Sequence, residues 1–223
     1  MKRIVIALLL VLIASSAAAQ SISDIQNGLI PENTVVQLQN VTVTAARNNG
    51  FFVAEAPYGP YNGIWIYSAA DLGFVPGDIV NIIGEYYEYF GLSEVDVTVV
   101  GALVAGAGTG PVPAPYEVPA AVYAADGEPF ESCLIKLTDM LTVTALLDFG
   151  EWTEETMDST EILFDDYFFD ETSLTVGDCH LSATGIPVFS FGAFKIEALA
   201  DGLPACPVGV EETTFGTLKS LYR

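Results

Sequence analysis

Apolar and polar residues alternate along the chain in short runs. VVQLQNVTVTA at 35–45 alternates in this way and is rich in β-branched residues, which is typical of a half-buried strand. Gly, Pro or Asp residues separate it from further runs of the same kind: GFFVAEA at 50–56, GIWIYSA at 63–69, DIVNIIGEYYE at 78–88 and GLSEVDVTVV at 91–100. Only short helical turns are expected, near 21–27 and 118–125. The pattern predicts an all-β protein.

This pattern returns about one hundred residues later in the chain. Self-similarity at a fixed offset indicates a repeated structural unit. The landmarks recur in the same order: QNVTVTA at 39–45 and DMLTVTA at 139–145, Gly77-Asp78 and Gly177-Asp178, Gly84 and Gly185, Gly91 and Gly192. We interpret the chain as two copies of one module.

The repeated glycines have a structural reason in a small barrel. Gly77-Asp78 suits a tight turn, since Gly tolerates a positive φ and an Asp side chain bonds nearby backbone. Gly84 lies inside a strand, where Gly allows a sharp bend or a bulge. Gly91 suits the hairpin into the next strand. A chain with two barrels needs each of these features twice.

Each module offers five short runs, which is the strand count of a small barrel. We expect tandem five-stranded barrels at 20–104 and 121–206. The segment 105–120 between them is rich in Gly, Ala and Pro and poor in large apolar residues, which predicts an extended linker. The last residues, 207–223, follow the second barrel as a tail, for which a sorting signal and an ordinary terminal helix both remain open.

The order of strand, turn, GFFV, GIWIY and then V-x-G-D-x-V-x-x-x-G-x-x-x-x-x-x-G resembles the oligonucleotide/oligosaccharide-binding (OB) fold. In particular it is similar to OB modules of secreted bacterial proteins that accompany endonuclease/exonuclease/phosphatase domains. The resemblance covers about 21–100 and, more loosely, 118–200. It implies two OB-like barrels and a nucleic acid or an oligosaccharide as ligand.

OB barrels bind ligands across their second and third strands and the neighbouring loops. Ile64 and Ile66 stay large and apolar in the second copy, whereas Trp65 and Tyr67 become Leu163 and Asp165, so Trp65 and Tyr67 are expected on the outer face. Aromatic side chains there suit stacking on bases or sugars. The alternatives are that Trp65 packs on a loop or on the other module, and that the Tyr58 and Tyr61 loop is only a rigid hairpin. The candidate binding residues are Arg47, Phe52, Tyr58, Tyr61, Trp65 and Tyr67.

The first 19 residues have the pattern of a signal peptide: Lys2 and Arg3, an apolar run, and then Ala17-Ala18-Ala19. Removing Lys2 and Arg3 takes the formal net charge from −22 to −24. We expect a secreted or envelope-associated protein without a membrane span in the mature chain. Acidic residues far outnumber Lys and Arg, and this disfavours tight binding of a polyanion. The partners that remain are a weakly bound nucleic acid, a neutral oligosaccharide or a protein.

Cysteine is present at 133, 179 and 206, and export favours a disulfide. Strand five returns toward the start of strand four, so Cys179 and Cys206 are expected to pair, with Cys133 as the alternative partner. One His and dispersed Cys residues match no zinc pattern, and the acidic stretch 148–171 lacks a calcium loop, which favours a solvated acidic rim. Neither a metal nor another cofactor is therefore predicted.

His180 stands without an obvious nucleophile or orienting carboxylate, so no catalytic site is predicted. The sequence favours a secreted, non-catalytic tandem OB-fold protein that binds nucleic acid or oligosaccharide. The alternative is a structural or adhesive component of an extracellular assembly.

Overall fold

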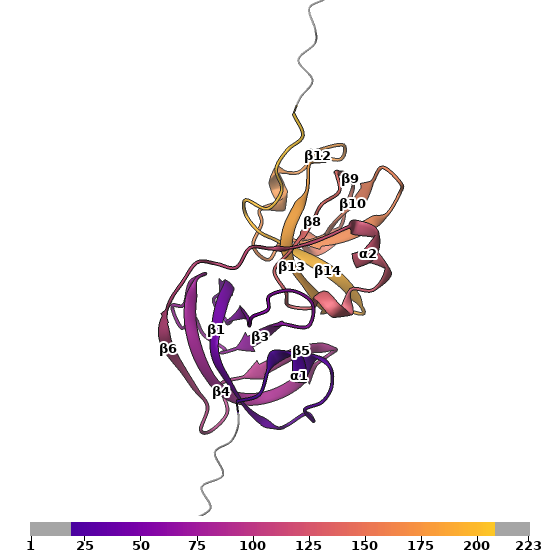
Figure 1. Ribbon diagram of the computed structural model, residues 1–223. Coiled ribbons are helices and arrows are strands. Elements are labelled where there is room, and N and C mark those ends of the chain that lie inside the picture. The colour runs from indigo at the N-terminus through magenta and orange to yellow at the C-terminus, as the bar shows by residue number, and fades with distance from the viewer. Residues whose placement is uncertain (1–18, 208–223) are drawn as a thin grey trace, which may run out of the picture.

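A computed structural model describes residues 19–207. The predicted signal peptide, 1–19, and the predicted tail, 207–223, lie outside this range apart from one residue each. Figure 1 shows the two halves of the described chain stacked on each other, with the first half below. Both halves are built mainly of strands, as the alternating pattern predicts.

The first half is a closed five-stranded barrel with one added strand. The strands follow the order β1-β2-β3-β5-β4, β4 pairs back with β1, and β6 is added beside β4. The pair β3 and β5 is parallel, and the other pairs are antiparallel. The strands are β1 (Val35–Arg47), β2 (Gly50–Ala54), β3 (Gly63–Tyr67), β4 (Asp78–Tyr89), β5 (Leu92–Asp96) and β6 (Leu103–Thr109).

The inside of this barrel holds one hydrophobic core. Alternate residues of each strand point inward, and Ile64, Ile66 and Val95 are completely buried there. Helix α1 (Ile22–Gln26) adds Ile22 and Ile25 to the same core. It begins at Ser21, whose hydroxyl accepts a hydrogen bond of 3.0 Å from the backbone N–H of Asp24.

The second half is a curled, eight-stranded sheet. Its order is β12-β9-β10-β11-β14-β13-β8-β7, and β11 pairs with β14 in parallel. The strands are β7 (Tyr116–Val118), β8 (Ile135–Leu137), β9 (Leu141–Leu146), β10 (Trp152–Thr156), β11 (Glu161–Asp165), β12 (Cys179–His180), β13 (Ala183–Ser190) and β14 (Ala193–Ala198). The helical turns are α2 (Ala120–Ala125), η1 (Glu128–Phe130), η2 (Asp148–Gly150) and η3 (Glu171–Ser173).

Strand pairings of the first half recur in the second half, but two strands are interrupted. β8 and β9 stand where β1 runs unbroken, and β12 and β13 stand where β4 runs unbroken. Equivalent Cα pairs in the two halves lie about one hundred residues apart. Val41–Val80 corresponds to Leu141–His180, Thr42–Ile79 corresponds to Thr142–Cys179, and Ile66–Val95 corresponds to Phe164–Ile196. A closed barrel was predicted for both halves; the first half is closed, and the ladder of the second runs from β12 to β7.

The predicted linker 105–120 takes part in both sheets. β6 continues through Thr109 in antiparallel pairing with β4, and β7 pairs in parallel with β8. The segment forms strands although it was predicted to be an extended linker. The reason is that Gly and Ala residues lack large side chains but still donate and accept backbone hydrogen bonds in a ladder. The helical turns expected near 21–27 and 118–125 are present as α1 and α2.

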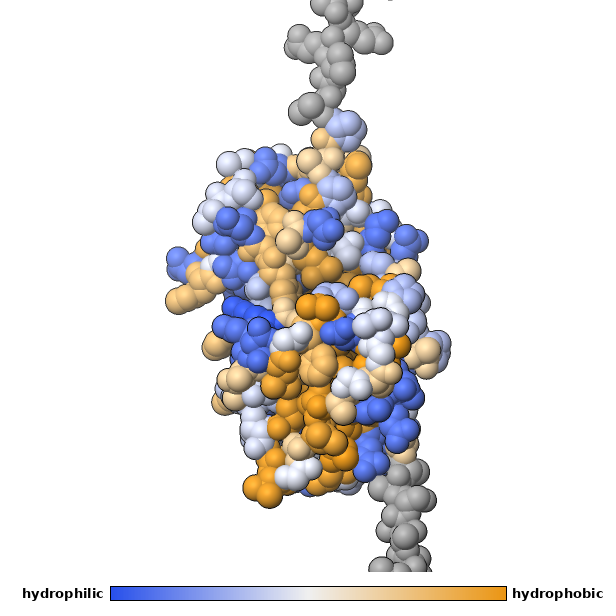
Figure 2. Space-filling view, turned by 90° about the vertical axis from the view of Figure 1, so that its left-hand side faces the viewer, coloured by the Kyte–Doolittle hydropathy of each residue, from blue (hydrophilic) through white to orange (hydrophobic). Residues whose placement is uncertain are grey.

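The side of the molecule near β6 is shown as a space-filling surface in Figure 2, where apolar residues run along the first half. β6 is an edge strand there, and Leu103 is largely exposed. No helix among the described residues is long and apolar enough to cross a membrane.

A candidate ligand-binding groove between the two halves

The outer face of the first barrel carries a row of side chains across four strands. Phe52 on β2 pairs with Trp65 on β3, Trp65 pairs with Glu94 on β5, and Glu94 pairs with Tyr87 on β4. Side chains of paired residues point to the same face of a sheet. The carboxylate of Glu94 therefore lies in a row with an aromatic residue on each side.

A second row lies two residues further along the same strands. Tyr67 pairs with Asp96, and Asp96 pairs with Glu85. Because alternate residues share a face, this row lies beside the first. Together the two rows form a surface of aromatic rings and carboxylates.

The second half covers part of this surface with the equivalent part of its own sheet. Tyr87 pairs with Glu94 on β5, and Val188 pairs with Lys195 on β14, which places Val188 at the position of Tyr87. The two halves share a hydrophobic cluster there: Ala45, Phe52 and Trp65 from the first half, and Leu134, Ile186 and Val188 from the second. The two copies thus pack the same outer face against each other.

Trp65 lies at the centre of this contact. Its ring centroid lies 4.6 Å from that of Phe52, and its edge lies over β2, where a Cβ added to Gly50 would come 2.4 Å from Trp65 Cζ2. Only 5% of Trp65 is exposed. Of the arrangements that the sequence leaves open for Trp65, the structure has the one in which Trp65 packs on the other module, and Phe52 lies in the same contact.

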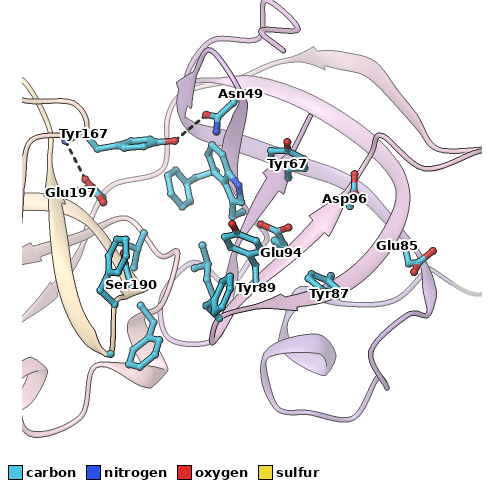
Figure 3. A pocket seen from close by; sticks show the side chains of 18 of the residues that line it. Asn49, Tyr67, Glu85, Tyr87, Tyr89, Glu94, Asp96, Tyr167, Ser190 and Glu197 are labelled. Atoms are coloured by element: carbon cyan, nitrogen blue, oxygen red, sulfur yellow. Dashed lines mark hydrogen bonds between the residues drawn. The ribbon is translucent and has the colours of Figure 1, made fainter. Parts of the chain in front are cut away.

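Beside this contact the two halves enclose a groove of about 1240 Å³. Figure 3 shows Tyr67, Tyr87, Tyr89, Glu94 and Asp96 from the first half on one side, facing Tyr167, Ser190 and Glu197 from the second half. Lys, Arg and His are absent from the described residues that line the groove. The groove is therefore aromatic and acidic.

Glu94 is the most deeply placed carboxylate of the first half in this groove. Only 7% of the residue is exposed, and its carboxylate accepts no hydrogen bond from any described residue. Burial raises its pKa to about 7, and the negative charges of Asp96 and Glu88 add to that shift. Because Glu94 lines the groove, a bound ligand can supply the hydrogen-bond donors that the described residues do not.

The second half contributes another buried carboxylate, Glu197, to the opposite wall. Its Oε2 accepts a 3.2 Å hydrogen bond from the backbone N–H of Tyr167. Burial raises the pKa of Glu197 to about 8, with the charge of Asp165 adding to the shift and those of Lys195 and Arg47 opposing it. Each wall of the groove thus carries a carboxyl group on a residue that is more than nine-tenths buried.

Tyr167 joins this wall to the first half. Its hydroxyl donates a 3.0 Å hydrogen bond to Asn49 Oδ1, as Figure 3 shows. The guanidinium carbon of Arg47 lies 3.1 Å from the centre of the Tyr167 ring. Arg47 therefore fixes a wall of the groove but does not line it.

The open side of the groove is bordered by two equivalent hairpin turns. Phe90-Gly91 joins β4 to β5, Phe191-Gly192 joins β13 to β14, and all of these residues have a positive φ. The ring of Phe189 lies against Gly91, so the turns of the two halves approach each other. Phe90 and Phe191 are exposed.

The predicted candidates divide into two groups. Phe52, Trp65 and Tyr67 line the groove, whereas Arg47, Tyr58 and Tyr61 do not. The loop of Tyr58 and Tyr61 instead packs on the second half, where the Tyr61 N–H donates to the carbonyl of Pro129 and Cys133 Sγ donates to the carbonyl of Gly59.

Glu94, Asp96 and Tyr87 were not among the candidate residues. The alternation in LSEVD places Glu94 and Asp96 on one face, and Trp65 marks that face on a neighbouring strand. The sequence does not show that β3 pairs with β5, and this pairing brings residues about thirty positions apart into one row.

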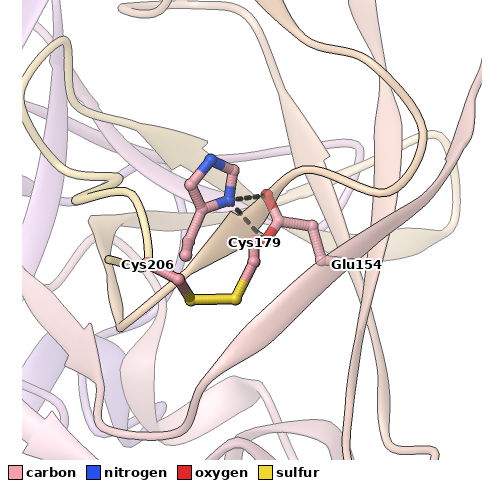
Figure 4. The surroundings of a disulfide bond; sticks show 4 residues. Glu154, Cys179 and Cys206 are labelled. Atoms are coloured by element: carbon pink, nitrogen blue, oxygen red, sulfur yellow. Dashed lines mark hydrogen bonds and ion pairs between the residues drawn. A yellow bond between two sulfur atoms is a disulfide. The ribbon is translucent and has the colours of Figure 1, made fainter. Parts of the chain in front are cut away.

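The disulfide predicted between Cys179 and Cys206 is present, as Figure 4 shows, and Cys133 is free and buried. Beside it, His180 Nδ1 lies 2.9 Å from Glu154 Oε2, and Trp152 Nε1 donates a 2.9 Å hydrogen bond to Glu154 Oε1. Glu154 and His180 are both buried. This carboxylate has partners within the protein, unlike that of Glu94.

Within residues 19–207, no group of three or more His, Cys, Asp or Glu residues is placed to hold a metal ion. No family model and no curated protein matches the chain. One solved structure, described as "Structural mimicry for functional antagonism", is similar over 81% of this chain and 94% of its own, with 14% identity and a TM-score of 0.37. So weak a likeness carries no argument about fold or function.

Proposed function

We propose that this protein is a secreted, non-catalytic binding protein that holds an oligosaccharide in the groove between its two halves. The supporting observation is Glu94, which is buried, accepts no hydrogen bond from any residue that the structure describes, and lies in a row between Trp65 and Tyr87. Sugar hydroxyls would supply the missing donors, and flat sugar faces would lie on the exposed Tyr rings.

The strand order of the first half supports this interpretation. A five-stranded barrel with the order β1-β2-β3-β5-β4 and a parallel β3–β5 pair fits the OB fold predicted from the sequence. In this proposal the second half is a copy of that barrel with β1 and β4 interrupted. The groove then lies on the face from which OB barrels bind oligosaccharides and oligonucleotides.

An oligosaccharide fits the groove better than a nucleic acid does. Phosphate groups would meet Glu85, Glu94, Asp96 and Glu197 without a lining Lys or Arg among the described residues. Secretion is supported by the amino-terminal signal-peptide pattern and by the Cys179–Cys206 disulfide.

The test is a glycan array at low salt, followed by calorimetric titration of any glycan that binds. Tyr87 is 43% exposed and lines the groove, whereas Tyr58 is 44% exposed and does not. Tyr87→Ala is expected to weaken glycan binding at least about fivefold, since loss of one stacking ring costs roughly 1–3 kcal/mol. Tyr58→Ala is the matched control and should bind normally.

Two outcomes would contradict the proposal. One is that no glycan binds the folded protein, and the other is that both Tyr variants bind as the parent does. Either result would favour the alternative function, a structural component in which the aromatic face serves only to hold the two halves together.

A further inference from the structure

Glu94 and Lys195 occupy equivalent positions in the two halves. In the first half, Ile66 pairs with Val95 across the parallel β3–β5 ladder, and Glu94 precedes Val95. In the second half, Phe164 pairs with Ile196 across the parallel β11–β14 ladder, and Lys195 precedes Ile196. One site therefore carries a carboxylate in one copy and an ammonium group in the other.

Lys195 shows what this position does when it carries a cation. Its ammonium Nζ is paired with Glu151 Oε1 and lies 2.9 Å from Asp165 Oδ2. It also lies 5.7 Å from the centre of the Phe191 ring. Only 3% of the Lys195 side chain is exposed. The second half thus pairs two of its carboxylates, Glu151 and Asp165, with a lysine of its own.

The first half has carboxylates on the same face, and no described residue there is such a lysine. Tyr67 stands where Asp165 stands in the second half, and Asp96 stands where Glu197 stands. Glu94, Asp96 and Glu85 are close together there, and the described residues lining the groove include no cation. Burying a carboxylate is costly unless a positive group accompanies it.

The surroundings of Glu94 suit an ammonium group in particular. Trp65 and Tyr87 flank it in its row, and Tyr67 and Tyr89 also line the groove. Aromatic faces attract cations, more strongly where water is partly excluded. A sugar hydroxyl would gain only hydrogen bonds from the carboxylates, whereas an ammonium group would also gain the opposite charge.

We propose that the groove selects oligosaccharides that carry free amino groups, and that a ligand ammonium binds Glu94 and its neighbouring carboxylates as Lys195 binds Glu151 and Asp165. This inference rests on the proposed function, since it specifies the ligand class of the same groove. The probe is a β-linked glucosamine oligomer, and its N-acetylated form is the neutral counterpart.

The first experiment titrates the unmodified protein with glucosamine, N-acetylglucosamine and glucose oligomers of equal length and linkage. The glucosamine oligomer is expected to bind at least about tenfold more tightly, and its advantage should shrink as salt is added. Equal binding of all oligomers would overturn the amine preference and leave the proposed function standing. Binding of none would overturn both. Binding of polylysine alone would also overturn both, since it would identify a basic peptide as the partner.

The second experiment changes the position itself. Glu94→Lys copies the second half, and it is expected to abolish binding of the glucosamine oligomer because the groove then holds its own cation. Glu94→Gln should bring the affinities for the amino and N-acetyl oligomers to within about threefold of each other. Asp71→Asn is the control for Glu94→Gln, because it also converts one carboxylate to an amide, at an exposed position outside the groove. An amine preference that persists in Glu94→Gln would overturn the role of Glu94.

Calorimetry of the unmodified protein gives a readout that does not depend on variants. At about pH 5 the raised pKa keeps the Glu94 carboxyl protonated in the free groove and the ligand amine is charged, so an arriving ammonium that favours the carboxylate should release a proton to the buffer. Titrations in two buffers with different ionisation enthalpies measure that proton. Glucosamine oligomer binding without proton release would contradict direct contact between the ammonium and Glu94.

Discussion

The ring of Phe189 lies against Gly91, so that the last hairpin of the second half closes on the last hairpin of the first. A Cβ atom added to Gly91 would come 2.7 Å from Phe189 Cδ1. The equivalent Gly192 has a similar positive φ, 88° compared with 93°, and has nothing within 4 Å of its added Cβ. The two glycines therefore differ in the neighbour they meet and hardly in backbone conformation.

Gly91→Ala is expected to destabilise the protein more than Gly192→Ala. Both substitutions place a side chain at positive φ, at a cost of about 1–2 kcal/mol, and only Gly91→Ala adds a clash with Phe189 worth about 1–3 kcal/mol. Chemical denaturation of both variants measures the difference. Equal losses of the free energy of unfolding would show that the hairpins do not press on each other in solution.

Trp65→Ala is expected to lower the free energy of unfolding by about 3–5 kcal/mol, as for other buried aromatic side chains. The reason is that Trp65 lies in the hydrophobic cluster shared by the two halves. Thermal and chemical denaturation measure the loss, with Val100→Ala at a fully exposed position as the control. A loss below about 1 kcal/mol would indicate that the two halves separate readily and expose Trp65.

Glu131 is expected to make the protein less stable at high pH. The residue is 1% exposed, its Oε1 accepts a 3.0 Å hydrogen bond from the Ser93 N–H, and its Oε2 has no partner among the described residues. Burial raises its pKa from an ordinary 4.5 to about 8. A raised carboxyl pKa means that the folded state holds its proton more tightly. The contribution of the protonated Glu131 carboxyl to the free energy of unfolding is therefore fully present below about pH 4.5 and is lost as the pH rises through about 8.

Chemical denaturation at about pH 5 and about pH 9 tests this expectation. The free energy of unfolding should fall by roughly 3–5 kcal/mol from this group, since each unit of pKa corresponds to about 1.4 kcal/mol. Glu131→Gln should remove that part of the fall, whereas Glu32→Gln, at an exposed position, should not. Part of the fall should persist in Glu131→Gln, because burial also raises the pKa of Glu197. An unchanged pH dependence in Glu131→Gln would contradict the assignment.

Loss of the Cys179–Cys206 disulfide is expected to destabilise the protein by about 3–4 kcal/mol. The bridge joins residues 27 positions apart and so restricts the unfolded chain. The paired variant Cys179→Ser/Cys206→Ser should show the loss in non-reducing buffer. The unmodified protein should show the same loss after full reduction. A bridge between Cys133 and Cys179 in non-reducing peptide mapping would contradict the structure.

Much of the fold follows from the sequence alone. The alternation in VVQLQNVTVTA and GIWIY determines which residues face the core, because side chains of a strand alternate between its two faces. Ile64 and Ile66 accordingly lie inside the barrel. The repeated glycines mark the turns of both halves, because a positive φ at Gly77, Gly91, Gly177 and Gly192 favours a residue without a side chain.

The tertiary structure decided the site. Sequence alternation places Trp65 on the outer face of the barrel but cannot show that Ile186 and Val188, more than a hundred residues away, cover it. The parallel pairing of β3 with β5 brings Glu94 beside Trp65, and the equivalent pairing of β11 with β14 gives Lys195 the same position. These relationships depend on contacts between segments far apart in the chain. Local patterns determine which face a residue takes, and only the packing of the two halves determines what that face meets.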